Sequence, residues 1–418
     1  MSITANDVAS LLQKYRMMAL DYNHDLKAAE KNISASVELE RAARADLKPK
    51  LQGGANFQYT GNPMELSLSL PGSVNPVTFQ GNEVNYGASV SLLQPVYTGG
   101  RVLEAIRLAQ HRNSLANYEL EAIRNAVCYQ TDIQYWNTVA RAEMVGIATE
   151  FRNSVASLTE TIRERVRVGL IDSQDLLMAE VKLNEAEYLL LQAKNNLVTG
   201  RMALNSILGT PLDVSTLLDE TIPVVSCNDT LFSMSEPDRP EVKIASGQVQ
   251  IAESSLRLND SKYKPQLYIG AEGSFSSPGY NFNSDPDPNY GVYAKLTVPI
   301  FEWGKRRNER NSYAQRRGIA LDNLHKVEDW VELEIATARV ALKQALSQVE
   351  LSENSLGKAK ENERKALERY QEGKVSILEV IDAQTYRQTS QINYVQAKAA
   401  AQGHYSALLK SLNAYPNY

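Results

Sequence analysis

The sequence predicts a mainly α-helical protein with antiparallel β-hairpins, built as two tandem structural repeats. Two observations support this fold class. Local matches recur along the chain: Pro49-Lys50-Leu51 returns 216 residues later as Pro265-Gln266-Leu267, and Gly169 returns 204 residues later as Gly373. The spacing changes only inside the hairpin loop, as a true duplication requires. Between the matches, long stretches of helical periodicity alternate with short stretches of period two.

The first repeat is predicted to cover residues 1–209. Its opening segment is rich in Ala, Glu, Leu and Arg, which favour helix, and Pro49 ends it. The sequence Gly209-Thr210-Pro211 is typical of a helix end. In chain order the expected elements are a helix (3–47), a β-hairpin (50–98), a long helix (100–168), a tip (169–172) and a return helix (173–208).

The second repeat is predicted to cover residues 239–418 and to follow the same plan. Pro211, Pro223 and Pro237 interrupt the segment between the repeats, so 210–238 is expected to be an irregular linker that packs at mid-height. The expected elements of the second repeat are a helix (239–263), a β-hairpin (266–301), a long helix (304–371), a tip (372–375) and a return helix (376–413).

The long helices are expected to be nearly straight. Apolar side chains from Leu115 to Ile162 recur about every 3.6 residues, which is the period of a straight helix rather than a supercoiled one. At 1.5 Å per residue, the helix over 100–168 is about 100 Å long. An ordinary globular core does not accommodate a helix of that length.

The predicted strands alternate apolar and polar residues, and the hairpins are rich in aromatic side chains. This pattern is typical of a membrane β-barrel with aromatic girdles. Four strands do not close a barrel, and lipid does not tolerate an open sheet edge. If the strands lie in a membrane, the chain must therefore oligomerise, and three chains supply twelve strands. Glu272 and Lys295 lie opposite the apolar face and are expected to line a wet barrel lumen.

Several functional classes are excluded by composition and motifs. A formal net charge of −5 without a basic block argues against a nucleic-acid partner. Cys128 and Cys227 are too far apart in sequence for a framework of disulfides or a metal site, and the four histidines have no ligand spacing. No phosphate-binding or nucleophile motif is present. We therefore expect no enzyme activity, no catalytic residues, no cofactor and no metal.

Membrane insertion through a helix is not expected. The sequence has no run of eighteen apolar residues, so it predicts no transmembrane helix. The residues after Met1 do not form a recognisable signal peptide, and a chain whose export signal had been removed would look the same.

The two tips carry acidic residues just beyond their glycines. Glu379 and Asp382 are three residues apart after Gly373, so their carboxylates share one helix face. Asp175 follows Gly169 by six residues, as Glu379 follows Gly373. Acids in the first turns of a helix are stabilised by its dipole. These residues are candidates for a negatively charged pore constriction, and the alternative is a solvated acidic helix start.

The chain resembles the TolC family of outer-membrane efflux channels. The duplicated plan covers nearly all 418 residues. The most specific matches are the tip Arg369-Tyr370-Gln371-Glu372-Gly373 and the two strand-to-helix junctions, Leu92-Leu93-Gln94-Pro95-Val96-Tyr97-Thr98-Gly99-Gly100-Arg101 and Thr297-Val298-Pro299-Ile300-Phe301-Glu302-Trp303-Gly304-Lys305.

The resemblance implies a homotrimer in which a twelve-stranded outer-membrane β-barrel is continued by a long α-helical barrel through the periplasm. It implies that Glu379 and Asp382 line the periplasmic constriction and that Tyr370 helps to hold the closed state. Asp175 matches an acidic position of the first tip. The turns at Gly169 and Gly373 would contact a periplasmic adaptor, and through it an inner-membrane pump.

Alternatives remain open for the single residues and for the function. Val375 stands where the family has a basic gating residue, so the closed-state bonds of the family do not transfer as a whole. Tyr370 is either a gate residue or a buried packing residue, and Asp175 is either a gate residue or a helix-start acid. The predicted function is a passive exit duct of an efflux or type I secretion system in the outer membrane of a Gram-negative bacterium. The alternative is a periplasmic helical scaffold or adaptor without a pore.

Overall fold

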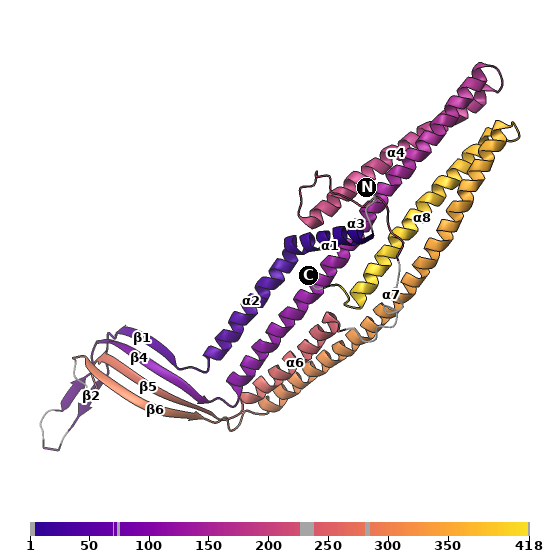
Figure 1. The fold of residues 1–418 in the computed structure, drawn as a ribbon. Helices are drawn as coiled ribbons and strands as arrows, with labels where there is room; N and C mark the ends of the chain where they lie inside the picture. Colours follow the sequence, from indigo (N-terminus) through magenta and orange to yellow (C-terminus); the bar gives the residue numbers. More distant parts are fainter. Residues whose placement is uncertain (1–4, 70, 73–75, 226–237, 281–284, 417–418) are drawn as a thin grey trace. The chain divides into compact units, whose positions relative to one another are not determined.

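The computed structural model describes residues 5–69, 71–72, 76–225, 238–280 and 285–416 (Figure 1). Parts of three predicted segments lie outside the described residues: the start of the first helix, residues 226–237 of the linker, and the second hairpin loop. Cys227 also lies outside them. In chain order the described elements are α1 (Ala5–Tyr22), α2 (His24–Ala45), β1 (Lys50–Tyr59), β2 (Glu65–Leu68), β3 (Val77–Gln80), β4 (Val84–Tyr97), α3 (Arg101–Arg167), α4 (Ser173–Leu208), α6 (Pro240–Ser261), β5 (Gln266–Ser277), β6 (Asp287–Thr297), α7 (Lys305–Gln371) and α8 (Ile377–Ser411).

The single helix predicted over 3–47 is two helices, because Asn23 interrupts it. The backbone amide of Asn23 donates a hydrogen bond to the carbonyl of Ala19 at the end of α1. The side chain of Asn23 accepts a hydrogen bond of 2.8 Å from the amide of Leu26 at the start of α2. An asparagine side chain that accepts an amide proton three residues later is an N-cap. Helical periodicity continues across such a break, which is why the sequence pattern did not reveal it.

The loop of the first hairpin contains a further strand pair. β2 and β3 form a separate two-stranded antiparallel sheet in which Leu66 is paired with Phe79. The sequence predicts only one hairpin over 50–98, because Gly, Pro, Asn and Ser are frequent in this stretch and are typical of a loop. Four-residue strands are too short for period-two alternation to stand out.

The chain forms two compact units that do not coincide with the two repeats. One unit contains residues 1–31, 117–244 and 325–418, and the other contains 32–116 and 245–324. Each unit therefore takes parts of both repeats. The reason is that α3 and α7 each continue from one unit into the other.

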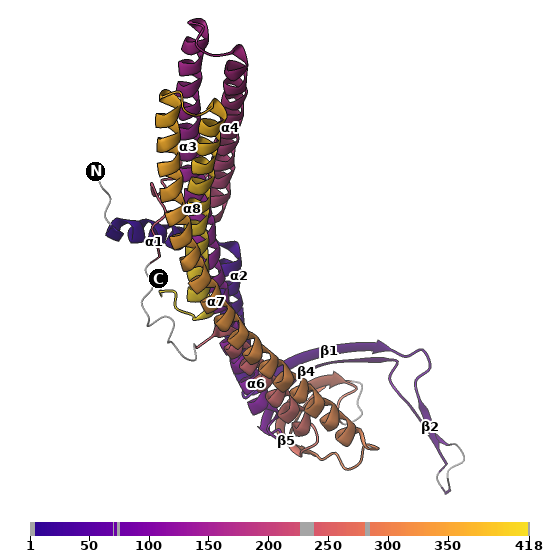
Figure 2. The ribbon, with the colours of Figure 1, turned by 90° about the vertical axis from the view of Figure 1, so that its right-hand side faces the viewer.

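The smaller unit is built on a four-stranded antiparallel sheet with the order β1-β4-β5-β6 (Figure 1; Figure 2 shows β1, β4 and β5 from another side). The central pair, β4 and β5, joins the two repeats, with Val90 opposite Gly273. The registers place most of the apolar positions on one face of this sheet, and their side chains are exposed, as for Tyr290 at 88% and Val292 at 77%. That face carries Leu51, Ala55, Phe57, Tyr86, Val90, Leu92, Ile269, Phe275, Tyr290, Val292 and Leu296.

The larger unit consists of paired antiparallel helices, with α4 beside α3 and α8 beside α7 (Figure 1). Its main core contains Tyr135 and Trp136, whose rings meet edge to face at 4.9 Å. Asp132 is fully buried beside this core and accepts hydrogen bonds from Arg16, Ser406 and Tyr415 at 2.6–3.0 Å. A buried carboxylate needs such partners, and this one ties α1, α8 and the C-terminal segment to α3. Among the described residues, no helix is both long enough and apolar enough to cross a membrane.

The first part of the linker is irregular and packs on the helices of the larger unit. The hydroxyl of Tyr15 donates to the carbonyl of Leu217 at 2.7 Å, and the hydroxyl of Tyr135 donates to the carboxylate of Asp219 at 2.5 Å. Asp219 is only 7% exposed. Burial raises the pKa of Asp219 above its usual 3.8, against the opposing hydrogen bond from Tyr135.

The raised pKa of Asp219 predicts a pH-dependent effect of Asp219→Asn. When the pKa of a carboxyl group rises on folding, its ionised form destabilises the folded state. This destabilisation is present at neutral pH and disappears as the pH falls through the raised pKa, because the carboxyl group becomes protonated. The variant, whose amide oxygen still accepts from Tyr135, should have the higher free energy of unfolding at pH 7, and the gap should close on acidification. Denaturant titrations of the parent and the variant, from pH 7 down to acidic pH, measure this difference in the free energy of unfolding. Asp213→Asn, an exposed position of the same segment, is the control, and a gap that widens on acidification would contradict the assignment.

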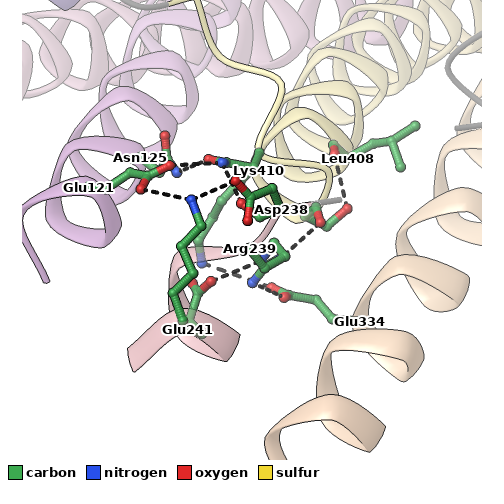
Figure 3. Close-up of polar contacts among 11 residues, drawn as sticks. Glu121, Asn125, Asp238, Arg239, Glu241, Glu334, Leu408 and Lys410 are labelled. Atoms are coloured by element: carbon green, nitrogen blue, oxygen red, sulfur yellow. Dashed lines mark hydrogen bonds and ion pairs between the residues drawn. The ribbon is translucent and has the colours of Figure 1, made fainter. Parts of the chain in front are cut away.

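The end of the linker is clamped by Arg239, which is 1% exposed (Figure 3). Its guanidinium donates to the carboxylates of Glu241 and Glu334 at 2.8 and 2.7 Å, and to the backbone carbonyl of Ser411 at 2.7 Å. The last of these oxygens belongs to the C-terminal turn of α8, where cations are favoured by the helix dipole. One arginine thus holds α6, α7 and α8 together.

Candidate functional site

Both tips are tight helix ends that require glycine. Gly169 has φ 75° and Gly373 has φ 71°, which is the left-handed region that other residues adopt at a cost. An added Cβ would meet nothing within 4 Å at either glycine, so backbone conformation alone selects the residue. The bonding is that of a Schellman motif in both tips. Its hydrogen bonds run from the amides of Gly169, Leu170, Gly373 and Lys374 to the carbonyls of Val166, Arg165, Tyr370 and Arg369, at 2.9–3.0 Å.

The return helices start differently. Asp172 is the N-cap of α4, and its side chain accepts a hydrogen bond of 3.0 Å from the amide of Gln174, which lowers the pKa of Asp172. Ser376 is the N-cap of α8, and its side chain makes no such bond. The sequence analysis missed the role of Asp172, although Asp followed three residues later by an acid is a recognisable helix start. Asp175 and Glu379 are both third residues of their helices, which fits the helix-start interpretation.

Glu379 and Asp382 are both exposed on one face of α8. The residues between them, Val380 and Ile381, are buried at 0% and 8% exposure. They belong to an apolar cluster with Leu158 and Ile162 of α3 and Ala179 of α4, so the two tips share one small core. The carboxylates therefore project away from this core, and their helix is anchored by the opposite face.

Tyr370 lies in the same apolar cluster and is 7% exposed. The Arg165 guanidinium lies over its ring at 4.9 Å from the centroid, which connects the two repeats. Burial raises the pKa of Tyr370; Arg165 opposes this effect and the Asp175 carboxylate adds to it. The Tyr370 hydroxyl has no hydrogen-bond partner among the described residues. The Tyr370 side chain thus packs in the core that the two tips share, and the Asp175 carboxylate lies close to it.

The sequence profile of the family described as "Outer membrane efflux protein" matches residues 16–210 and 231–414. This match includes both repeats and nearly the whole chain. The chain belongs to the outer membrane efflux protein family. The resemblance to TolC-family channels is thereby confirmed. This efflux protein is an exit duct of an efflux system, located in the outer membrane of a Gram-negative bacterium and reaching into the periplasm. The alternative of a helical scaffold without a pore is excluded.

Relatives of this efflux protein include two proteins of efflux systems. SrpC of Pseudomonas putida, a solvent efflux pump outer membrane protein, is 23% identical over 387 residues, which cover 88% of this chain and 77% of SrpC. CusC of Escherichia coli K12, a cation efflux system protein, is 22% identical over 387 residues, which cover 91% of this chain and 80% of CusC.

Solved structures share the fold of this efflux protein. The CmeC outer membrane channel of Campylobacter jejuni superposes with a TM-score of 0.81 at 20% identity, covering 99% of this chain and 89% of CmeC. VceC of Vibrio cholerae superposes with a TM-score of 0.79 at 18% identity, covering 98% of each chain. At these identities the likeness concerns the fold.

Glu272 and Lys295 of the efflux protein lie on the polar face of the sheet. Lys295 is paired with Tyr268, and Tyr268 and Glu272 are an even number of residues apart, so all three side chains share one face. Both charged side chains are exposed. The structure thus brings them to the same face of neighbouring strands, opposite the apolar face.

Arg387 is a residue that the sequence analysis did not identify. It donates to the carboxylate of Glu363 at 2.7 Å and also pairs with Glu150, while Gln391 donates to Glu150 at 3.0 Å. Burial lowers the pKa of Arg387 and raises the pKa of Glu363. This group connects α8 to α7 and α3 near the tips. Its members are 24 and 237 residues from Arg387, so no local pattern could have revealed it. Among the described residues, no group of His, Cys, Asp and Glu is arranged to hold a metal ion.

Proposed function

We propose that three copies of this chain form a continuous duct, with a twelve-stranded β-barrel in the outer membrane and an α-helical barrel in the periplasm. The observation that carries the proposal is the four-stranded sheet. One of its faces is mainly apolar and exposed, and β1 and β6 each have one side without a partner strand among the described residues. Unpaired strand edges are not tolerated in lipid. Pairing β6 with β1 of a partner subunit satisfies both edges, and the apolar face then contacts lipid.

The internal repeat predicts the register of that pairing. Within one chain, β4 of the first repeat pairs with β5 of the second, with Val90 opposite Gly273. The counterpart of Val90 in β6 is Ala294, 204 residues later, and the counterpart of Gly273 in β1 is Phe57, 216 residues earlier. The same contact between subunits therefore places Ala294 opposite Phe57 of the partner subunit.

A disulfide between these positions tests the duct. In a background with both native cysteines replaced, Ala294→Cys with Phe57→Cys should yield covalent trimers under mild oxidation, because the side chains share one face. Ala294→Cys with Gln58→Cys is the matched control, since the neighbouring residue points to the other face. Denaturing electrophoresis separates the species. Cross-linking of the control pair alone would contradict the register, and no cross-linking of either pair would contradict the barrel.

The tips of the three subunits would form the periplasmic entrance, with Glu379 and Asp382 as its acidic constriction. Their exposure on the face of α8 away from the tip core supports this role. Tyr370 and Asp175 would hold the closed arrangement, and the contact between Tyr370 and Arg165 of the first tip supports this role. Carboxylates converging on an axis attract cations and repel anions.

Glu272 and Lys295 would line the barrel lumen, because the polar face of the sheet becomes the inner face when the apolar face contacts lipid. Charged side chains in a water-filled lumen remain solvated. The duct would conduct its cargo passively and carry out no chemistry of its own.

The turns at Gly169 and Gly373 would contact a helical hairpin of a periplasmic adaptor, which connects the duct to an inner-membrane pump as the source of energy. Apolar side chains beside the first tip support this contact: Val168 is 62% exposed and Leu170 is 72% exposed. A groove near the tips, lined by Leu177, Met178, Val181 and Leu378 among others, extends this apolar surface. Exposed apolar patches mark interaction sites.

A further inference from the structure

The connection from β6 to α7 carries large exposed apolar side chains. We define residues 298–310 as the second junction. In it Ile300 is 93% exposed, Phe301 is 71% exposed and Trp303 is 90% exposed. The rings of Phe301 and Trp303 meet edge to face at 5.0 Å. The apolar face of β6 continues through Val298 into Ile300, so the second junction extends the surface that the proposed duct turns to lipid.

The backbone at Trp303 is held in an unfavourable conformation. Its φ is 48°, and Gly304 follows with φ 82°. The counterpart in the first repeat is Gly99, with φ 65°. A left-handed conformation is easy for glycine and costly for tryptophan, and such costs are retained where a side chain is needed for function. The second repeat thus keeps an indole at a position where the first repeat has the less strained residue.

Basic residues follow the exposed aromatic side chains directly. Lys305, Arg306 and Arg307 form the first turn of α7, which contains no acidic residue. Cations at a helix N-terminus oppose the helix dipole, so this arrangement is unfavourable in isolation. Arg306 lies over the ring of Tyr263 at 6.0 Å, whereas no ion pair of Lys305 or Arg307 occurs within the described residues. An external anion near the start of α7 would interact favourably with the helix dipole and would reduce the repulsion among these three basic side chains.

The corresponding junction of the first repeat differs at its turn, which is packed, whereas Val96 and Tyr97, the counterparts of Ile300 and Phe301, are also exposed, at 53% and 51%. Thr98 is 9% exposed, and a Cβ added to Gly99 would lie 2.6 Å from the Cβ of Lys264. The residues that correspond to Arg306 and Arg307 are Val102 and Leu103, and Val102 is buried. Because the packing of Lys264 on Gly99 leaves no room for a side chain at Gly99, the same packing by a partner subunit would not accommodate the indole of Trp303.

We propose that the second junction is an anchor that binds the anionic phospholipid surface of the periplasmic leaflet. Ile300, Phe301 and Trp303 enter the interfacial region, while Lys305 and Arg307 pair with lipid phosphates. Tryptophan is favoured at this depth, and basic residues beside a membrane are attracted by anionic lipids. The inference rests on the proposed duct, which brings the start of α7 to the periplasmic surface of the membrane.

Quenching of Trp303 by brominated lipids tests the proposal. The detergent-solubilised full chain is titrated with brominated phosphatidylglycerol or brominated phosphatidylcholine at equal mole fractions, and the Trp303 signal is obtained by difference from Trp303→Phe. We expect the anionic lipid to quench more strongly. Lys305→Gln with Arg307→Gln should reduce this preference roughly five-fold per charge removed, and raising the salt from about 0.1 M to about 1 M should also reduce it.

The matched control is Lys358→Gln with Lys360→Gln, which removes the same charge from exposed positions of α7 and should leave the preference unchanged. Equal quenching by both lipids would overturn the recognition of anionic lipid. Absence of quenching by either lipid, in protein that still forms the cross-link between Ala294→Cys and Phe57→Cys, would show that a subunit covers the second junction and would overturn the anchor. Loss of that cross-link as well would overturn the duct and the anchor together.

Discussion

Replacing Glu379 with Gln and Asp382 with Asn is expected to remove most of the cation preference of the reconstituted channel. Three subunits would place six carboxylates around one narrow entrance, where a low-dielectric wall strengthens their field. The substitutions keep side-chain size and remove the charge, and Val380 and Ile381 remain in the tip core. The ratio of cation to anion permeability, from reversal potentials in a planar bilayer, should fall roughly ten-fold.

The control for the entrance is Glu328→Gln with Asp329→Asn, which removes one Glu and one Asp per subunit from exposed positions in the middle of α7. This variant should keep the selectivity of the parent channel. Because surface charges are screened at high ionic strength, the difference between the two variants should shrink as salt rises. Equal selectivity of both variants at low salt would rule out Glu379 and Asp382 as the constriction.

Replacing Arg239 with Met is expected to cause the largest loss of stability of a single substitution considered for this chain. The guanidinium is 1% exposed and bonds two carboxylates and the end of α8 (Figure 3). Its loss would strand Glu241 and Glu334, whose side chains are 27% and 25% exposed and thus only partly solvated. The free energy of unfolding, from denaturant titration of the detergent-solubilised protein, should fall by about 2–3 kcal/mol.

Two further variants separate the causes. Arg239→Met combined with Glu241→Gln and Glu334→Gln removes the stranded charges and should recover part of the loss. Arg364→Met removes an exposed arginine of α7 that also bonds two glutamates, and it should have little effect. If the triple variant were no more stable than Arg239→Met, lost packing rather than stranded charge would explain the destabilisation. A similar effect of Arg364→Met would contradict the clamp.

Much of the architecture was predictable because its signals are local. The periods of 3.6 and 2 residues distinguish helices from strands within a few turns, and the glycines at the tips follow from backbone conformation alone. The shared face of Glu379 and Asp382 follows from their spacing. The same locality explains the errors: helical periodicity continues across Asn23, and the strands containing Leu66 and Phe79 are too short to alternate visibly.

The sequence alone predicts the duplication, the alternation of the strands and the position of the acidic residues after each tip, because each of these depends on the local order of residues along the chain. Which charged and polar side chains contact one another depends on the tertiary structure. Arg165 lies over Tyr370, Arg387 pairs with Glu363, and Tyr135 bonds Asp219. These partners are far apart in sequence, and their contacts form only when packing of apolar helix faces has excluded water around them. Once these polar groups are buried, each needs a partner, and the spacing of residues along the sequence does not show which partner it will have.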